Sequence, residues 1–191
     1  MMPVYFIRHG QSEFNAAVDL AVGDPLIFDA RLSSLGRRQA MAAREHVTTL
    51  DIERVIVSPL TRAIETALHI FHDGPAIEVD PRPRELLSNS CDVGRSPSEL
   101  ARSFPQLSFD HISENWWHQG TVNEHGVGLE PMDVFARRVS EFRDWLLEQS
   151  SQTIAVVGHG NLFKAMIGRT LGNCEIHPFE YQGQVIFPCD R

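Results

Sequence analysis

The sequence has few cysteines: Cys91, Cys174 and Cys189 are odd in number and lie far apart among 191 residues. This usage excludes a disulfide framework and is typical of free thiols in a reducing compartment. No stretch reaches the roughly 20 consecutive apolar residues that a membrane-spanning helix requires. The first residues reach Arg8 after a short apolar run without a small-residue cleavage site, so we expect no signal peptide. These absences favour a cytoplasmic protein that does not enter a membrane.

Positive charge is also in short supply. The chain has 17 lysine and arginine residues against 25 aspartate and glutamate residues, for a formal net charge of -8. An acidic surface does not attract polyanions, so we expect neither nucleic acid nor an anionic membrane as a partner. Any site for an anion must therefore be a local cluster of cations. No pattern in the sequence indicates an oligomeric state.

The length and the 42% of hydrophobic residues suffice for one well-buried core, so we expect residues 1–191 to form a single domain. Three short apolar runs, at 4–7, 55–57 and 154–157, are rich in β-branched or aromatic residues and show no polar alternation. Such runs are typical of strands that are covered on both faces. A further short strand is expected at 77–79.

Stretches with helical spacing alternate with these runs, at about 33–50, 60–71, 131–149 and 160–171. The alternation predicts an α/β fold, a three-layer sandwich in which helices cover both faces of a mostly parallel central sheet. Residues 88–128 show little periodicity beyond a short candidate helix at 97–104, and we interpret them as a lid-like excursion over the functional edge of the sheet. Trp116 and Trp117 within it fit either a wall over a ligand or plain packing.

Unusual polar residues follow each of the three central strands. Arg8 and His9 follow the first, Ser58 and Arg62 the second, and His159 the third. Ligands of open α/β sheets bind just beyond the carboxyl ends of the strands, so we expect these segments to meet in one crevice. Arginine forks bind phosphate oxygens bidentately, and two nearby arginines repel a divalent metal unless carboxylates stand alongside them. The cluster therefore predicts an anion site and no metal site.

His9 is the candidate nucleophile. The neighbouring cations disfavour its protonation, which leaves a ring nitrogen with a free lone pair at neutral pH. A hydrogen bond from the other ring nitrogen to a carbonyl would fix the tautomer. We expect Gly10 to allow its backbone to approach the imidazole or the substrate closely.

Four segments in order resemble the histidine phosphatase superfamily, the phosphoglycerate mutase-like proteins: RHGQSEFN (8–15), DARLSSLGRRQA (29–40), SPLTRAIETA (58–67) and VGHGN (157–161). The resemblance implies that His9 takes the phosphoryl group and that Arg8, Arg62 and His159 complete the pocket. It implies a further phosphate contact at Asn15, a weaker one at Ser12, and no metal or organic cofactor.

The resemblance leaves two candidates for the proton donor. Glu85 lies in an Arg-Glu-Leu segment similar to the one that supplies the acid in many relatives, but the usual Glu-Gly continuation is absent. Asp92 lies in the Cys-Asp-Val-Gly sequence nearby and is the rival. This region is more similar to the fungal and plant phosphoglycerate mutase-like phosphatases. Alternatively, Glu85 is a plain ion-pair partner of Arg84 or Arg82.

The resemblance implies a metal-independent phosphatase that forms a phosphohistidine on His9, acting on a small phosphorylated metabolite. The alternatives are phosphotransfer of the phosphoglycerate mutase or sugar bisphosphatase type and a non-catalytic module that binds a phosphorylated ligand. The substrate is not readable from the sequence, and we expect the 15–32 loop and residues 88–128 to set specificity. Arg62 could also be a surface charge paired with Glu65.

Overall fold

The computed structural model describes residues 3–18, 23–149 and 151–180. Cys189 and residues 19–22 of the 15–32 loop lie outside the described residues. The described part contains a five-stranded sheet in the order β3-β2-β4-β1-β5. The strands are β1 (Val4–Arg8), β2 (Arg54–Val57), β3 (Ile77–Val79), β4 (Ile154–Gly158) and β5 (Ile176–Pro178). Strands β1 to β4 are parallel, whereas β5, which was not predicted, pairs antiparallel with β1.

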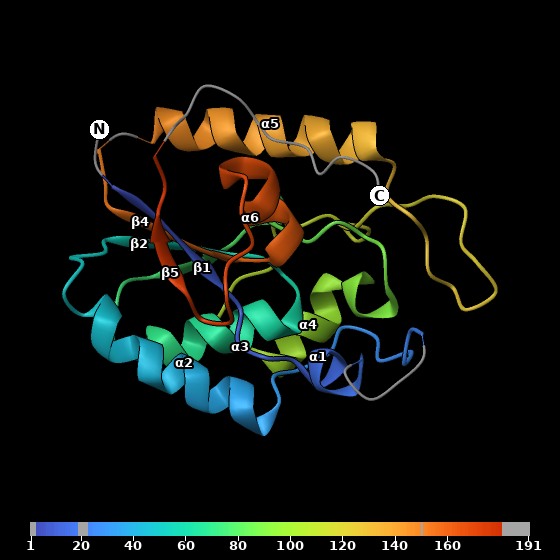
Figure 1. Cartoon of the computed structure of the whole chain (residues 1–191), viewed down its shortest axis with the longest axis horizontal. Helices are drawn as coiled ribbons and strands as arrows, with labels where there is room; N and C mark the ends of the chain where they lie inside the picture. Colours follow the sequence, from blue (N-terminus) through green and yellow to red (C-terminus); the bar gives the residue numbers. More distant parts are fainter. Residues whose placement is uncertain (1–2, 19–22, 150, 181–191) are drawn as a thin grey trace.

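The central strands are buried on both faces, as their continuous apolar sequences predict. Ile7, Val57 and Val157 point to one face and pack into the core beneath α2 (Ser34–Val47) and α3 (Thr61–Ile70). Phe6 and Val156 point to the other face, against α5 (Met132–Glu148) and α6 (Gly160–Ile167). This is the two-residue period of a pleated strand. Helices on both faces of a mostly parallel sheet confirm the predicted fold class (Figure 1).

The helices begin and end where local chemistry permits. The Ser33 hydroxyl caps α2 by accepting a hydrogen bond from the Gly36 amide at 3.0 Å. Gly168 ends α6 in the left-handed conformation, with φ of 74°. One face of α5 is fully buried, and each such apolar side chain stabilises the fold by roughly 1.5–3 kcal/mol; its members are Phe135, Val139, Phe142 and Leu146.

Residues 88–128 reach the core only through scattered buried side chains such as Leu100, Phe109 and Trp116, and residues 119–126 are exposed. They include a short 3-10 helix, η1 (Ser90–Asp92), and α4 (Pro97–Ser103). Trp116 is 4% exposed, donates its indole N–H to the Arg95 carbonyl at 2.9 Å, and joins the core of α2 and α3. A Cβ atom at Gly94 would approach the Trp116 ring to 2.3 Å, so glycine is required there. The packing alternative is therefore correct for Trp116, and a lid over the site is not confirmed.

A short helix, α1 (Glu13–Val18), was not predicted from the sequence. Its amide at Asn15 donates to the Ser12 hydroxyl at 3.1 Å, a capping arrangement that a serine before a glutamate could have indicated.

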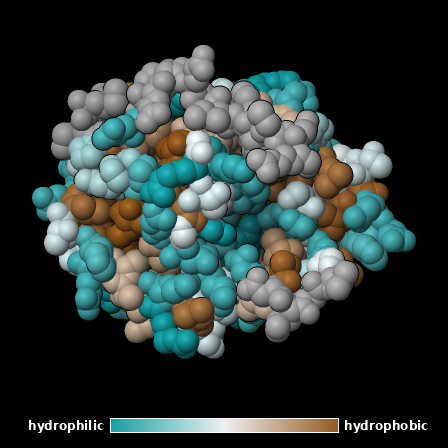
Figure 2. All heavy atoms as spheres, in the orientation of Figure 1, coloured by the Kyte–Doolittle hydropathy of each residue, from teal (hydrophilic) through white to brown (hydrophobic). Residues whose placement is uncertain are grey.

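The described surface is mixed in polarity. Figure 2 shows a mainly hydrophilic face with apolar side chains in scattered patches. Of the helices within the described ranges, none has the length and apolar character needed to cross a bilayer. Cys91 and Cys174 are buried free thiols, as predicted.

Candidate active site

The polar residues that follow β1, β2 and β4 come together, because these strands are neighbours in the parallel sheet. The ring centroids of His9 and His159 lie 5.2 Å apart. The Arg62 Nε lies 3.3 Å from the His9 Nε2. The crevice expected from the sequence is thus observed at the carboxyl ends of the strands.

His9 is oriented by the backbone. Its Nδ1 lies 2.7 Å from the Gly10 carbonyl oxygen, so Nδ1 carries the proton and donates, and Nε2 keeps its lone pair. The ring is 3% exposed, and burial, followed by the Arg62 charge, lowers the pKa of His9 well below its ordinary value of 6.5. His9 is therefore a neutral imidazole at neutral pH, and the lone pair of its Nε2 accepts a hydrogen bond from the Arg62 Nε.

The Gly10 backbone approaches the His9 imidazole, as expected, and Gly10 also has a second role. A Cβ atom at Gly10 would lie 2.6 Å from the Gly36 carbonyl oxygen, and one at Gly36 would lie 2.0 Å from the Gln11 carbonyl oxygen. The two glycines allow the end of β1 to contact the start of α2. Gly10 therefore serves this close contact of two backbones as well as the approach of its carbonyl to the His9 imidazole at 2.7 Å.

Arg62 belongs to the interior. It is 2% exposed at the start of α3, so the alternative of a surface charge paired with Glu65 is wrong. Its Nη1 donates to the Cys91 carbonyl at 2.6 Å and its Nη2 to the Asp92 carboxylate at 2.8 Å. Glu65 instead accepts a hydrogen bond from the Leu32 amide. The 91–92 segment therefore holds the Arg62 guanidinium beside His9.

Two buried polar atoms beside His9 have no hydrogen-bond partner among the described residues: the Nε of Arg8 and the Nδ1 of His159. Arg8 uses another nitrogen to donate to the Leu171 carbonyl at 2.6 Å. His159 is fully buried, and its Nε2 lies 2.8 Å from the Ser58 hydroxyl. Unpartnered buried polar atoms are rare in folded proteins, so this pair indicates a place for a ligand with acceptor atoms.

A cavity of about 250 Å³ opens over His9. It is lined by Arg8, His9, Ser12, Phe14, Asn15, Arg62, Glu85, Asn89, Cys91, Asp92, Gly160, Asn161, Lys164 and Thr170. His159 is not in the lining, although its ring neighbours that of His9. From residues 88–128, all of which are described, only positions 89, 91 and 92 reach the cavity.

Several lining residues were missed from the sequence. Lys164, the single lysine of the chain, lies one turn after Gly160 on α6 and could have been found from that spacing. Phe14, Asn89 and Thr170 carried no signal, because only tertiary packing brings them to the cavity.

Asn15 lines the cavity, and the oxygen of its side chain is already hydrogen-bonded within the protein. Its Oδ1 accepts from the Ser12 amide at 3.1 Å and from the Ser12 hydroxyl at 3.0 Å. The amide group of the Asn15 side chain therefore remains as its donor. Ser12 is 1% exposed and its hydroxyl is used in this local arrangement.

The two candidate acids differ in their partners. Glu85 accepts from the amides of Asn161 at 3.1 Å and Leu162 at 3.3 Å, so its carboxyl caps the start of α6. Burial, followed by the nearby Asp92 charge, raises the pKa of Glu85 above its ordinary value of 4.5. Asp92 accepts from Arg62 and, through its other oxygen, from the Asn89 amide at 3.1 Å.

The ion-pair alternative for Glu85 is wrong. Arg82 pairs with Asp80, and Arg84 lies 3.3 Å from the Glu130 carboxylate.

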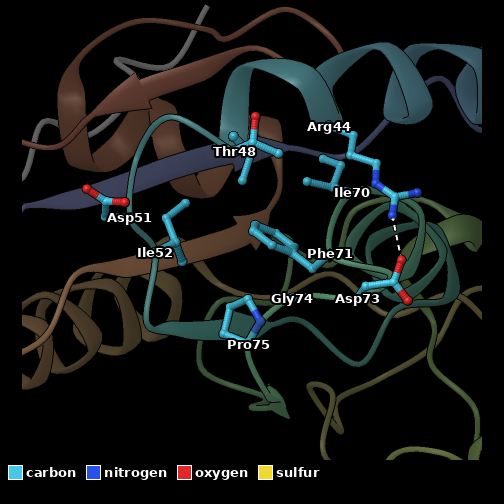
Figure 3. A pocket seen from close by; sticks show the side chains of 10 residues that line it. Arg44, Thr48, Asp51, Ile52, Ile70, Phe71, Asp73, Gly74 and Pro75 are labelled. Carbon is cyan, nitrogen blue, oxygen red and sulfur yellow. Dashed lines mark hydrogen bonds and ion pairs between the residues drawn. The ribbon is translucent and has the colours of Figure 1, made fainter.

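Of the other cavities, one of about 390 Å³ has four arginines but no histidine among its described lining residues: Arg82, Arg84, Arg137 and Arg138. The one in Figure 3, about 280 Å³, lies before the first residues of β2 and β3, at the opposite end of the sheet. The exposed Arg44–Asp73 pair and the Phe71 ring line it. A larger cavity of about 630 Å³ between α2 and β5 has no arginine or lysine among its described lining residues. Within the described ranges, no group of three or more histidine, cysteine or acidic side chains is placed to hold a metal.

Comparisons with known proteins found a matching family model and similar proteins. The model of the histidine phosphatase superfamily (branch 1) matches residues 4–183. The glucosyl-3-phosphoglycerate phosphatase of Mycolicibacterium vanbaalenii is 28% identical over 168 residues, which cover 87% of this chain and 72% of that protein. A phosphoglycerate mutase-like protein of Arabidopsis thaliana is 26% identical over 208 residues, 90% of this chain and 75% of that protein.

Two solved structures share the fold. A mycobacterial glucosyl-3-phosphoglycerate phosphatase in complex with VO3 superposes with a TM-score of 0.60 at 25% identity, covering 93% of this chain and 90% of the other. The alpha-ribazole phosphatase of Shigella flexneri superposes with a TM-score of 0.63 at 18% identity, covering 100% of both chains.

Proposed function

Because the chain belongs to the histidine phosphatase superfamily and is a phosphoric monoester hydrolase of that type, we propose that it acts through a phosphohistidine on His9. The observation that supports this most is the pair of unpartnered buried atoms, on Arg8 and His159, beside a neutral imidazole. A phosphoryl group would satisfy both, because its oxygens accept hydrogen bonds.

The phosphate would be held by donors from three strand ends. We assign the Ser58 hydroxyl, 2.8 Å from the Nε2 of His159, as the donor of this hydrogen bond, which would leave the Nδ1 of His159 with a proton to donate to a phosphate oxygen. The Nε of Arg8 and the side-chain amide of Asn15 add two donors. Arg62 contributes positive charge beside the attacking nitrogen of His9.

The reaction has two steps. The Nε2 of His9 attacks phosphorus in line, the ester P–O bond breaks, and protonated Glu85 donates its proton to the departing oxygen. Water then attacks the phosphohistidine, Glu85 takes a proton from the water, and the P–N bond breaks to release phosphate and neutral His9.

Charge and positioning supply most of the acceleration. Enzymes accelerate hydrolysis of phosphate monoesters by up to ~10²¹-fold, whereas general acid catalysis supplies about 10²–10⁴-fold. The cluster of Arg8, Arg62 and His159 must therefore contribute more than the acid does.

Glu85 is favoured over Asp92 as the proton donor. Asp92 forms an ion pair with the Arg62 guanidinium, which favours its ionised form, whereas the Glu85 carboxyl accepts, within the described residues, only from backbone amides. The raised pKa of Glu85 keeps its proton available at higher pH than an ordinary carboxyl.

We propose a small phosphorylated metabolite as the substrate and the cytoplasm as the location. The cavity of about 250 Å³ suits a small molecule, and relatives named as phosphatases of glucosyl-3-phosphoglycerate and alpha-ribazole act on such compounds. We also keep the proposal that residues 1–191 form one domain, with the 88–128 segment contributing part of the cavity wall.

The first test is phosphate release from p-nitrophenyl phosphate in EDTA, with trapping of the phosphoenzyme after an acid-free quench. We expect activity in EDTA, an alkali-stable phosphohistidine, and loss of both in His9→Ala. His72→Ala, which alters an exposed histidine, is the matched control. Activity that survives in His9→Ala would refute the proposal, and so would activity that EDTA abolishes.

Two further measurements on the wild-type protein distinguish the alternative functions. Isomerisation of 3-phosphoglycerate without net phosphate release would indicate a mutase. Binding of inorganic phosphate without turnover of a panel of phosphomonoesters would indicate a binding module.

A further inference from the structure

Glu85 enters the site from a segment that has no regular secondary structure. Residues 80–89 follow β3 as turns and extended chain, and no helix or strand hydrogen bonds fix them. A general acid must nevertheless lie within hydrogen-bond reach of the leaving oxygen, and a displacement of about 1 Å can cost ~10²-fold in rate. Something outside the segment must therefore hold it.

Arg138, on the opposite element α5, provides this support. Its guanidinium donates to three carbonyl oxygens of the segment: those of Arg82 at 3.0 Å, Arg84 at 2.8 Å and Glu85 at 3.2 Å. Arg138 is 6% exposed, so these bonds are shielded from water. Figure 1 shows α5 alongside α6, the helix that the Glu85 carboxyl caps.

Glu130 orients the guanidinium and holds the other end of the segment. Its carboxylate accepts from Arg138 at 3.1 Å and 2.7 Å in a bidentate pair and is completely buried. The Glu130 amide donates to the Leu87 carbonyl at 2.9 Å, and its carboxylate accepts from the Leu87 amide at 3.4 Å. Contacts of the pair therefore flank Glu85 on both sides.

We infer that Arg138 and Glu130 are positioning residues for the proton donor: their buried, bidentate pair holds residues 82–87 so that Glu85 faces the leaving oxygen. The inference rests on the proposed role of Glu85. The pair lines no part of the cavity over His9 and contributes no atom to the reaction. A rigid guanidinium fork is required, because a lysine ammonium is a point charge and cannot span three carbonyls and a carboxylate.

The experiment compares kcat/KM on glycerol 2-phosphate, whose alkoxide leaving group needs a proton, with kcat/KM on p-nitrophenyl phosphate, whose leaving group does not. We expect Arg138→Gln to lower the ratio of the two by ~10- to ~100-fold. Arg138→Lys should not restore the ratio, although it restores the charge. The matched control is Arg137→Gln on the same helix, which alters an exposed residue paired with Asp133 and should leave the ratio unchanged.

Two further variants keep the test decisive. In the Glu85→Gln background, Arg138→Gln should cause no additional change in the ratio, because the acid is already absent. If Arg138→Gln does not fold, Glu130→Gln preserves the shape of the pair and should lower the ratio in the same direction. Circular dichroism at the assay temperature checks that each variant is folded.

The outcomes separate this inference from the proposed function. Equal losses on both substrates in folded Arg138→Gln, or rescue by Arg138→Lys, would overturn the positioning role while Glu85→Gln still lowers the ratio. An unchanged ratio in Glu85→Gln would instead overturn the acid assignment and this inference with it. Activity that persists in His9→Ala would refute the proposed mechanism as a whole.

Discussion

Two buried clusters of charge lie next to each other and differ in how completely they are satisfied. In the cluster below the Glu85 segment, all five N–H donors of Arg138 have acceptors, and the Glu130 carboxylate is fully engaged. In the cluster over β1 and β4, the Nε of Arg8 and the Nδ1 of His159 have no acceptor in the described part of the chain.

This difference distinguishes a cluster that holds the chain in place from a cluster that could bind a ligand. A buried donor that is satisfied within the protein stabilises one arrangement of the chain, whereas a buried donor left open costs about 1–3 kcal/mol until a partner arrives. Burial and positive charge occur in both clusters and do not distinguish them. The count of satisfied donors does, and it supports the proposal that the cluster around His9 binds the phosphate.

The largest effect on catalysis should come from Arg62→Ala, in the cluster around His9. We expect kcat/KM on p-nitrophenyl phosphate to fall by ~10³–10⁵-fold, because the charge beside the transferring phosphoryl group is lost. Glu85→Gln should cost much less on this substrate, because nitrophenolate leaves without a proton. Steady-state kinetics measure both, and equal losses would contradict the division of roles.

The buried pair of Arg138 and Glu130 should contribute more to the stability of the fold than Arg8 does. Arg138→Met leaves Glu130 buried with only Arg84, at 3.3 Å, to compensate it, and we expect the free energy of unfolding to fall by about 3–5 kcal/mol. Arg8→Met removes a side chain with an unpartnered nitrogen and should cost clearly less. Urea denaturation of both variants measures the two losses of unfolding free energy. A larger loss in Arg8→Met would contradict the prediction.

The pH dependence of kcat/KM should show the ionisation of both His9 and Glu85. The lowered pKa of His9 places the loss of nucleophile on the acid side, below pH 6.5. The raised pKa of Glu85 places the loss of the acid above pH 4.5, where kcat/KM on glycerol 2-phosphate should fall by about tenfold per pH unit once Glu85 ionises.

Glu85→Gln provides the control for this profile, because it leaves the substrate's own ionisation near pH ~6 unchanged. The alkaline decline of the wild-type protein should be absent in this variant. A decline that persists would assign it to another group.

The smallest effect should come from Lys164→Gln at the edge of the cavity. No carboxylate of the described residues forms an ion pair with Lys164, so its charge is available to a substrate that carries a second anionic group. We expect KM for such a substrate to rise by about 2- to 5-fold relative to p-nitrophenyl phosphate, corresponding to an exposed ion pair of about 0.5–1 kcal/mol. The difference should shrink in high salt, and an equal rise on both substrates would argue against this contact.

Local patterns were enough to predict the architecture and the centre of the site. Runs such as 55–57 and 154–157 are apolar at every position, which only a strand covered on both faces requires. The residues after them, His9, Arg62 and His159, could be expected to meet because parallel strands end at the same edge. Polar side chains at those positions therefore indicated the site before any coordinates.

Contacts between distant segments had no such signal. Arg138 reaches carbonyls 53 to 56 residues earlier in the chain, and nothing in the local sequence distinguishes it from the exposed Arg137. The packing role of Trp116 likewise depends on its contact with Gly94, which is distant in the sequence.

The sequence by itself determined the four parallel strands, the longer helices that cover them and the three strand ends that meet at His9, because periodicity and strand direction are local properties. Only the tertiary structure decided which buried donors are satisfied and which remain open. That depends on hydrogen bonds between residues far apart in the chain, and it separates the residues proposed to bind phosphate from those proposed to hold the proton donor.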